Sequence, residues 1–410
     1  MLKISTLFTL LFLSALSMAA YAGTYHLSDF ENQTSTFSDA PQRYIESPGL
    51  KSTLEVLTIK DTSYFRAALN PDFNIGPVGV GFDLNSYTAI GDHSGVPFNK
   101  DLQPLVLRSL YYETPDFGAK WGRLRYVTYG TGLMVRNYDS GTAGSTLFTA
   151  EKGGLSGHVT IGKFNIEALK TGSEFSAIRT SFPIISNVGF GKDLILGMNW
   201  ANDSNGVFNQ DGSTLSPPVT GYSTDLTLPV FGPLFRLYSE YATLSGRGSG
   251  WAMGFGGTAD PFFDYRLEYR SFGTRFLPGY FNDFYESNPL VLTPRSSNTE
   301  GIFGFAGFNL NNYIRSEISI ELYNNIPPSL TASLGWRPLF NVVGVVNYVQ
   351  TFATGANPGY GTETAEFLYL TGGAYDYLFN IKRVYNSVGY YDQSYSVGVR
   401  VNVSKFFGLK

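Results

Sequence analysis

The 410-residue sequence contains no cysteine, which excludes disulfide bonds, thiolate metal sites and a lipid anchor on cysteine. Histidine is scarce, with three residues in the whole chain. Beyond the N-terminal segment no apolar run reaches the roughly 18 residues that a membrane-spanning helix requires. The net charge of -4 is small and no basic tract occurs, so nucleic-acid binding has no support.

Charged residues are also few, at 15% of the chain, whereas soluble proteins usually contain about 25%. Aromatic residues are abundant at 16%, glycine occurs 46 times, and the mean hydropathy is only -0.06. This combination favours a structure whose strands alternate between lipid-facing and water-facing side chains.

The first 22 residues have the pattern of an export signal. Lys3 gives a positive start, Leu7 to Leu16 an apolar core, and Ala20-Tyr21-Ala22 a cleavage site. The apolar core is too short to span a bilayer as a helix. The predicted divisions of the chain are a signal peptide at 1–22, a periplasmic lead-in or small plug at 23–50, and the main folded domain at 51–410.

Segments that alternate with a period of two recur through the rest of the chain. Four valines at 397, 399, 401 and 403 share one face of the last such segment, and small polar residues share the other. Residues 76–85 show the same alternation, with glycines on the polar face. Glycine is normally depleted in strands, so its repeated use there indicates a crowded or sharply curved interior.

Short and long connections alternate between these segments. If each segment crosses once, the long polar connections fall mostly at one end, which is typical of membrane barrels. The pattern predicts about 18 strands, within a range of about 16 to 20. Aromatic residues gather near segment ends and predict two girdles at the membrane surfaces. Members include Tyr111, Tyr112, Trp121, Trp200, Phe262, Phe263 and Trp336.

The last segment ends in Phe406 and Phe407, shortly before the C-terminus. With the export signal, this ending resembles bacterial outer-membrane β-barrels, whose closing strand ends in an aromatic residue that the assembly machinery reads. Here three further residues follow Phe407. The resemblance implies an all-β, transmembrane, antiparallel up-and-down barrel of a single domain in the bacterial outer membrane. It also implies contact with outer-membrane lipid and the barrel assembly machinery, and a homo-trimer as in many porins.

Three segments place charged residues on one face and apolar residues on the other. A lysine or arginine at the membrane midplane costs about 2 to 4 kcal/mol, so these faces are predicted to point into the lumen. They either line a constriction that selects solutes or form an internal network of ion pairs. The candidates are Arg236, Glu240, Asp264, Arg266, Glu268, Arg270, Arg315, Glu317 and Glu321.

The connection from Thr274 to Asn298 carries more large apolar side chains than an exposed loop normally does. Three placements are open: packing on its neighbours at the rim, folding into the barrel as a constriction or plug, and contact with a ligand. Its aromatic members are Phe276, Tyr280, Phe281, Phe284 and Tyr285.

Signatures of an enzyme or a metal protein are weak. His93 stands between Asp92 and Ser94, but consecutive residues of an extended segment point apart and cannot form a relay. The oxygen-rich stretch at 202–206 is typical of a turn rather than a calcium loop. Gly130-Thr131-Gly132 is predicted within a strand rather than before a helix, so it is not a phosphate loop. No catalytic residue, metal or cofactor is predicted.

The size and strand number favour porins and substrate channels over small, filled barrels. The leading hypothesis is therefore passive diffusion of small polar solutes or ions across the outer membrane. The alternatives are a plugged structural or adhesin-like surface barrel, a transporter of apolar molecules, and a soluble secreted all-β protein.

Overall fold

The structure is a computed structural model of the whole chain. It describes residues 49–59, 62–90, 105–124, 127–140, 153–172, 174–188, 191–208, 214–216, 218–259, 262–282, 285, 298–310, 314–324, 328–339, 341–351, 361–371, 375–385 and 391–401. The predicted signal peptide, most of the predicted lead-in, and Phe406 and Phe407 lie outside these residues.

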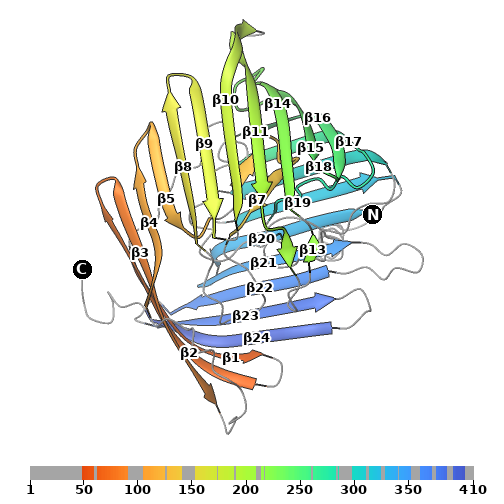
Figure 1. Cartoon of the computed structure of the whole chain (residues 1–410). Helices are drawn as coiled ribbons and strands as arrows, with labels where there is room; N and C mark the ends of the chain where they lie inside the picture. The colour runs from red at the N-terminus through yellow and green to blue at the C-terminus, as the bar shows by residue number, and fades with distance from the viewer. Residues whose placement is uncertain are drawn as a thin grey trace.

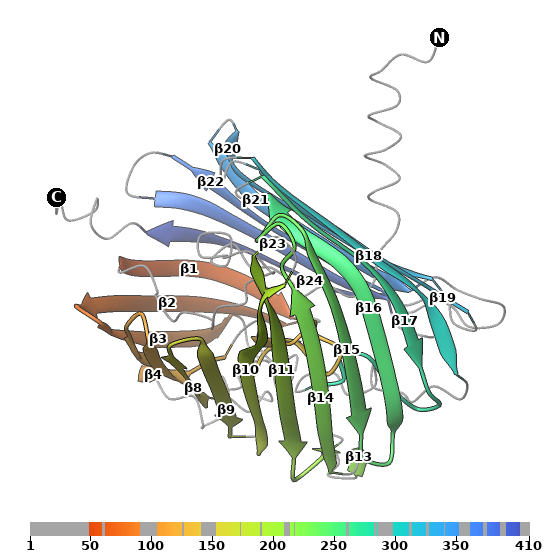
Figure 2. The same ribbon diagram turned by 90° about the horizontal axis from the view of Figure 1, so that it is seen from above.

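Twenty strands form one sheet that closes on itself around a lumen (Figure 1, Figure 2). The sheet closes because the last strand pairs with the first, Val397 opposite Val56. All pairs in this ring are antiparallel neighbours in chain order, as an up-and-down barrel requires. The count lies at the upper end of the predicted range.

The strands of the ring fall into four stretches of the chain. The first is β1 (Gly49–Ile59), β2 (Thr62–Ile75), β3 (Val78–Ile90), β4 (Leu105–Glu113) and β5 (Phe117–Gly122). The second is β8 (Gly154–Ile161), β9 (Phe164–Thr171), β10 (Phe175–Val188), β11 (Lys192–Asp203) and β14 (Val219–Leu228). The third is β15 (Arg236–Leu244), β16 (Gly248–Ala259), β17 (Phe263–Phe272), β18 (Thr299–Leu310) and β19 (Ile314–Tyr323). The fourth is β20 (Ser329–Leu339), β21 (Val342–Thr351), β22 (Gly361–Leu370), β23 (Tyr375–Tyr385) and β24 (Tyr391–Val401).

Four shorter strands lie outside the ring and form two hairpins. One joins β6 (Val127–Tyr129) to β7 (Val135–Tyr138), and the other joins β12 (Val207–Phe208) to β13 (Thr214–Ser216). In the described residues no helix has the length and apolar character needed to cross a membrane.

The connections divide between the two ends of the barrel as predicted. Because successive strands run in opposite directions, the long connections at 91–104, 123–153, 204–218, 273–298 and 352–360 all lie at one end. The tight turns after β2, β8, β16 and β20 lie at the other end. The ends are called the long-loop end and the short-turn end below.

Predicted alternation is confirmed strand by strand. In β3, Gly79 and Gly81 are buried, whereas Val78 and Leu84 are exposed. The closing strand β24 shows the same alternation, with Val397 exposed and Gly398 buried. The strands whose side chains the structure describes thus turn an apolar row outward and a smaller or more polar row inward.

Candidate functional site

The charged face of β17 points into the lumen, as its alternation predicts. Glu268 and Arg270 are buried, while Leu267 and Tyr269 on the opposite face are exposed. The inward row of β16 alongside it is Gly250, Ala252, Gly254 and Gly256. A Cβ atom on Gly254 would come within 2.2 Å of the backbone oxygen of Leu267 and 2.9 Å of Glu268 Cγ. The small residues of β16 therefore make room for the charges of β17, and the predicted crowding is present.

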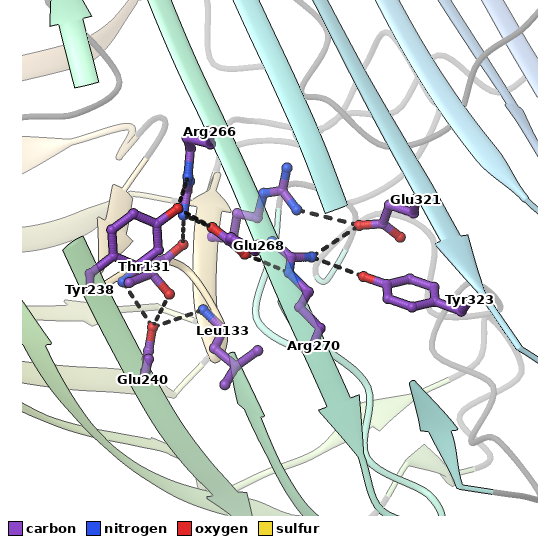
Figure 3. Close-up of polar contacts among 10 residues, drawn as sticks. Thr131, Leu133, Tyr238, Glu240, Arg266, Glu268, Arg270, Glu321 and Tyr323 are labelled. Atoms are coloured by element: carbon purple, nitrogen blue, oxygen red, sulfur yellow. Dashed lines mark hydrogen bonds and ion pairs between the residues drawn. The ribbon is translucent and has the colours of Figure 1, made fainter. Parts of the chain in front are cut away.

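These charges neutralise one another in a buried network (Figure 3). Glu268 accepts hydrogen bonds from Arg266 Nη2 and Arg270 Nε, both at 2.6 Å, and from the Tyr238 hydroxyl at 2.9 Å. Arg270 Nη1 also donates to Glu321 Oε1 at 3.2 Å. A buried carboxylate flanked by two guanidinium groups has its charge compensated, and losing it would leave two cations in the interior.

An unpredicted element enters the lumen beside this network. The chain leaves the wall after β5 at Gly122, whose φ of 132° lies in the left-handed region. A Cβ there would lie 2.3 Å from the Arg108 backbone oxygen, so only glycine fits. The segment that follows is the inner hairpin, defined as β6, β7 and the turn between them. A bidentate ion pair of Arg123 with Asp139, at 3.0 and 2.8 Å, closes its base.

The expectation that Gly130-Thr131-Gly132 lies within a strand is wrong. Gly130 and Gly132 have φ of 67° and 87°, and they form the turn of the inner hairpin. Glu240 Oε2 accepts hydrogen bonds from this turn: from Thr131 N at 2.8 Å, Thr131 Oγ1 at 2.7 Å and Leu133 N at 3.2 Å. Arg266 Nη2 donates to the Thr131 backbone oxygen at 2.6 Å. Glu240 and Arg266, two of the predicted lumen residues, thus hold the inner hairpin in place. The position of this hairpin inside the lumen was not predicted from the sequence.

The aromatic loop, of which the structure describes residues 273–282 and 285, also enters the lumen and joins the inner hairpin. Backbone hydrogen bonds run from Gly279 N to Leu133 O at 2.8 Å, from Phe281 N to Met134 O at 3.1 Å, and from Arg136 N to Phe281 O at 3.0 Å. Val135 and Phe281 form a parallel bridge. Segments about 145 residues apart in the chain thus become one unit, which we call the plug.

Aromatic rings make up the centre of the plug. Phe276, Tyr280 and Phe281 are fully buried, and Tyr285 is 2% exposed. Phe281 lies 4.6 Å from Phe175 of β10 between ring centroids, within the range for favourable aromatic pairs. The Tyr285 hydroxyl donates to Asp203 at the end of β11. Phe284 lies outside the described residues.

The plug packs on one side of the barrel only. Its hydrophobic core includes inward residues from the long-loop ends of β9 to β11 and β14 to β17, together with Tyr323 of β19. Within the described residues, β1 to β4 and β20 to β24 contribute nothing to it. Wall members are Leu169, Phe175, Ala177, Ala201, Val219, Ala242, Leu244, Ala252, Phe272 and Tyr323.

Arg136 connects the inner hairpin to the charged network. Its guanidinium lies 3.6 Å from Glu321 Oε1 and 4.7 Å from the ring centroid of Phe303. Arg270 approaches the same ring to 3.8 Å. Burial and the neighbouring Arg270 lower the pKa of Arg136 from its ordinary value, and Glu321 acts in the opposite direction. Phe303 thus provides an electron-rich face to guanidinium groups from both the plug and the wall.

The remaining predicted lumen residues also face inward. Arg236 of β15 is buried, and Asp264 of β17 is half-buried. Arg315 donates to Glu317 Oε1 at 2.8 and 2.6 Å on β19. Asp264, Arg315 and Glu317 lie near the short-turn end, whereas Arg270 and Glu321 lie toward the plug. Whether any of them selects solutes stays a prediction.

The histidines and the oxygen-rich stretch that the sequence analysis considered show contacts of a structural kind. His158 lies in the interior on β8, with Nε2 3.4 Å from Glu113 Oε1. Asp203 accepts from the backbone N–H groups of Asn205 and Gly206 at 3.0 and 2.9 Å, which is a turn contact. His26 and His93 lie outside the described residues. No cluster of three potential metal ligands occurs in the part of the chain that the structure describes.

The outer surface of the barrel is apolar on the strands whose side chains the structure describes. Large hydrophobic side chains are exposed on alternate positions, opposite the buried polar row. Examples are Leu237 and Tyr241 on β15, Trp251, Met253 and Phe255 on β16, Leu267 and Tyr269 on β17, Ile318, Ile320 and Leu322 on β19, and Tyr377 and Phe379 on β23. Soluble proteins rarely expose so large an apolar area, whereas lipid covers it in a membrane barrel. The protein is an outer-membrane β-barrel.

Predicted girdle residues largely lie on this surface. Tyr112, Trp121, Phe262 and Phe263 are exposed near strand ends. Tyr111 is the exception, because it is buried and its hydroxyl donates to Asn74 Oδ1 at 2.8 Å. The reason is the alternation of β4, which turns one residue of the Tyr111-Tyr112 pair inward.

No protein-family model and no curated protein matches the chain. Similar solved structures include the ferric enterobactin receptor from Pseudomonas aeruginosa, with a TM-score of 0.37 and 10% identity over 87% of this chain and 81% of that chain. Another is a Rhodopseudomonas blastica porin, with a TM-score of 0.28 and 8% identity over 87% of this chain and 99% of that chain. These identities and TM-scores are too low to support an assignment. The assignment to the outer membrane therefore rests on the closed ring of strands and its apolar outer surface.

Proposed function

We propose that the protein is an outer-membrane channel through which small polar solutes or ions diffuse passively. The proposed passage runs between the plug and the opposite wall, which is formed by β20 to β24, β2 and β3. The observation that carries this proposal is the one-sided plug core, to which the described residues of that wall contribute nothing. Barrels of 16 to 18 strands already enclose an aqueous channel in general, so about half the lumen of a 20-stranded barrel is wide enough for a small solute.

The opposite wall has the chemistry that a polar passage requires. Its inward positions carry hydroxyl and amide groups, which can replace part of the hydration shell of a passing solute. These include Ser329, Thr331, Ser333, Asn347, Thr364, Asn380 and Asn74. The space above Gly79 and Gly81 of β3 is filled by the Tyr111 ring and by the ion pair of Arg108 with Asp72.

A second candidate is a plugged surface barrel that conducts nothing. It is favoured by the extent of the core inside the lumen, where Phe276, Tyr280 and Phe281 are fully buried. In that case the barrel would be a scaffold for its long loops rather than a pore.

Single-channel recording separates these candidates. The refolded protein without residues 1–22 is inserted into a planar bilayer at moderate salt. The channel proposal predicts discrete, ohmic conductance steps. Insertion without conductance, verified by detergent-resistant membrane association, would reject the open passage and put the plugged surface barrel first.

A further inference from the structure

Two buried carboxyl groups lie side by side beneath the turn of the inner hairpin. Asp225 of β14 and Glu240 of β15 are direct cross-strand partners, and each is 2% exposed. A Cβ on Gly130 would lie 2.9 Å from Asp225 Oδ2 and 3.0 Å from Glu240 Oε2, so the turn rests on both groups. Like charges directly opposite each other in a sheet are unfavourable, and burial strengthens the effect.

The two carboxyl groups are compensated unequally. Asp225 accepts two hydrogen bonds from Arg179, at 2.6 and 3.1 Å, and one from Asn199 Nδ2 at 3.3 Å. Glu240 Oε2 accepts only from the uncharged donors of the inner hairpin. Glu240 Oε1 is buried with no partner in hydrogen-bond geometry among the described residues. An ionised Glu240 is therefore a buried charge beside a like charge, and the hydrogen-bond donors that the structure describes around it, those of the inner hairpin and Ser223, are uncharged.

The other groups around Glu240 leave this imbalance in place. From β10, Arg179 is committed to Asp225, and from β9, Glu167 lies 3.9 Å from Arg179. The neighbouring inward residues of β16 are Ala252 and Gly254, which carry no charge. On β17, Arg266 is bonded to Glu268 and to the inner hairpin.

The remaining neighbours include two more cations, Arg236 and Arg136. On its own strand, Glu240 is flanked by Tyr238 and, further along, Arg236. On β14 the adjacent inward residue is Ser223, which accepts from Asn199. The inner hairpin adds Arg136, which lies against Glu321.

We propose that Glu240 and Asp225 form a proton-binding site that fastens the plug. A proton on Glu240 Oε1 removes the buried like charge and leaves all three hydrogen bonds to Oε2 intact. The protonated pair therefore fits the plugged lumen, whereas a water-filled lumen favours the ionised pair. Because the plugged state binds the proton more readily, acid fastens the plug and rising pH loosens it. The site thus regulates the passage proposed above.

A thiol reporter tests the proposal without requiring conductance. The natural chain has no cysteine, so Met134→Cys, on a fully buried residue of the plug, introduces one thiol. Ser204→Cys, on an exposed residue, corrects for the pH dependence of the labelling reaction itself. With a membrane-impermeant thiol reagent on detergent-solubilised protein, the corrected rate at position 134 is expected to rise about fivefold from about pH 5 to about pH 8. A flat corrected rate would overturn the proposal.

Two further variants identify the group that titrates. In Glu240→Gln the amide oxygen keeps the three hydrogen bonds and the NH2 group stands where the proton would be, so position 134 should label slowly at every pH. In Asp225→Asn, Arg179 becomes free to compensate Glu240, so the pH dependence should also disappear. Glu317→Gln, on a buried carboxylate away from the plug, should keep the wild-type dependence. A wild-type profile in Glu240→Gln, or its loss in Glu317→Gln, would contradict the assignment.

If wild-type labelling follows pH as expected but the barrel does not conduct, the channel proposal fails and the proton site stands. If it conducts with a pH-independent plug, the reverse holds.

Discussion

The two sides of the lumen differ in the side chains that they present. From β9 to β19 the inner wall carries buried charges and aromatic rings, separated by the glycine and alanine row of β16. From β20 to β24 and on β2 and β3 most of the described inward residues are small or uncharged, with charged exceptions such as Asp72, and none of them contributes to the plug core. The same alternation thus builds one wall that binds part of its own chain and another along which we propose that solutes pass.

Space explains why the plug lies on the charged side. A plug held by buried charges needs compensating charges on the wall and room for its own backbone. Glu240 and Arg266 supply the compensating charges, and the small residues from Gly250 to Gly256 leave the room. Serine and threonine on β20 offer neither strong charge compensation nor apolar contact. This difference explains why the plug is anchored on one wall and not on the other.

Removing the aromatic loop should have the largest effect on this difference. Replacing 276–286 by a short glycine–serine linker removes the rings at the centre of the plug core and its backbone bonds to the inner hairpin. We expect single-channel conductance to increase several-fold, because the freed half of the lumen fills with water. The control shortens the connection between β21 and β22 at 353–359, at the same end of the opposite wall. Equal conductance in the loop deletion and in wild type would show that the plug does not occlude the lumen.

A smaller effect is expected from removing a buried carboxylate of the charged wall, compared with a more exposed carboxylate on the outer face of the opposite strands. Glu268→Ala leaves Arg266 and Arg270 buried without their shared counter-ion, and should destabilise the barrel by about 3 to 5 kcal/mol. Glu363→Ala breaks a more exposed pair with Arg383 on the outer face, near the long-loop ends of β22 and β23, and should cost about 0 to 1 kcal/mol. Urea unfolding, followed by the electrophoretic shift of folded barrels, measures both. Equal losses would mean that the network is not compensated as described.

Much of the barrel could be predicted from the sequence because its rules are local. A period of two fixes which residues face lipid, so Arg266 and Glu268 were placed inward correctly from the alternation of β17 alone. The direction of successive strands also predicted that the long connections lie at one end of the barrel and the short turns at the other. The strand number was less certain, because strands such as β5 are short and their boundaries carry a weak signal.

The plug could not be predicted with the same certainty because it depends on contacts distant in sequence. The composition of 276–285 indicated an unusual loop, and folding into the barrel was one of three open placements. The inner hairpin was missed, since Gly130 and Gly132 alternate with larger residues as in a strand. The sequence did contain a usable signal: Gly130 and Gly132 flank a single threonine, and closely spaced glycines favour a turn with positive φ.

The most direct test compares the reactivity of one thiol on each wall. Thr364→Cys places it on a half-buried inward position of β22, and Ala252→Cys places it beneath the plug on β16. A charged, water-soluble methanethiosulfonate is applied during single-channel recording. We predict that modification at position 364 reduces the conductance, while position 252 stays unreactive unless the aromatic loop is deleted. Rapid modification at 252 in the intact protein, or none at 364, would contradict a passage along the wall opposite the plug.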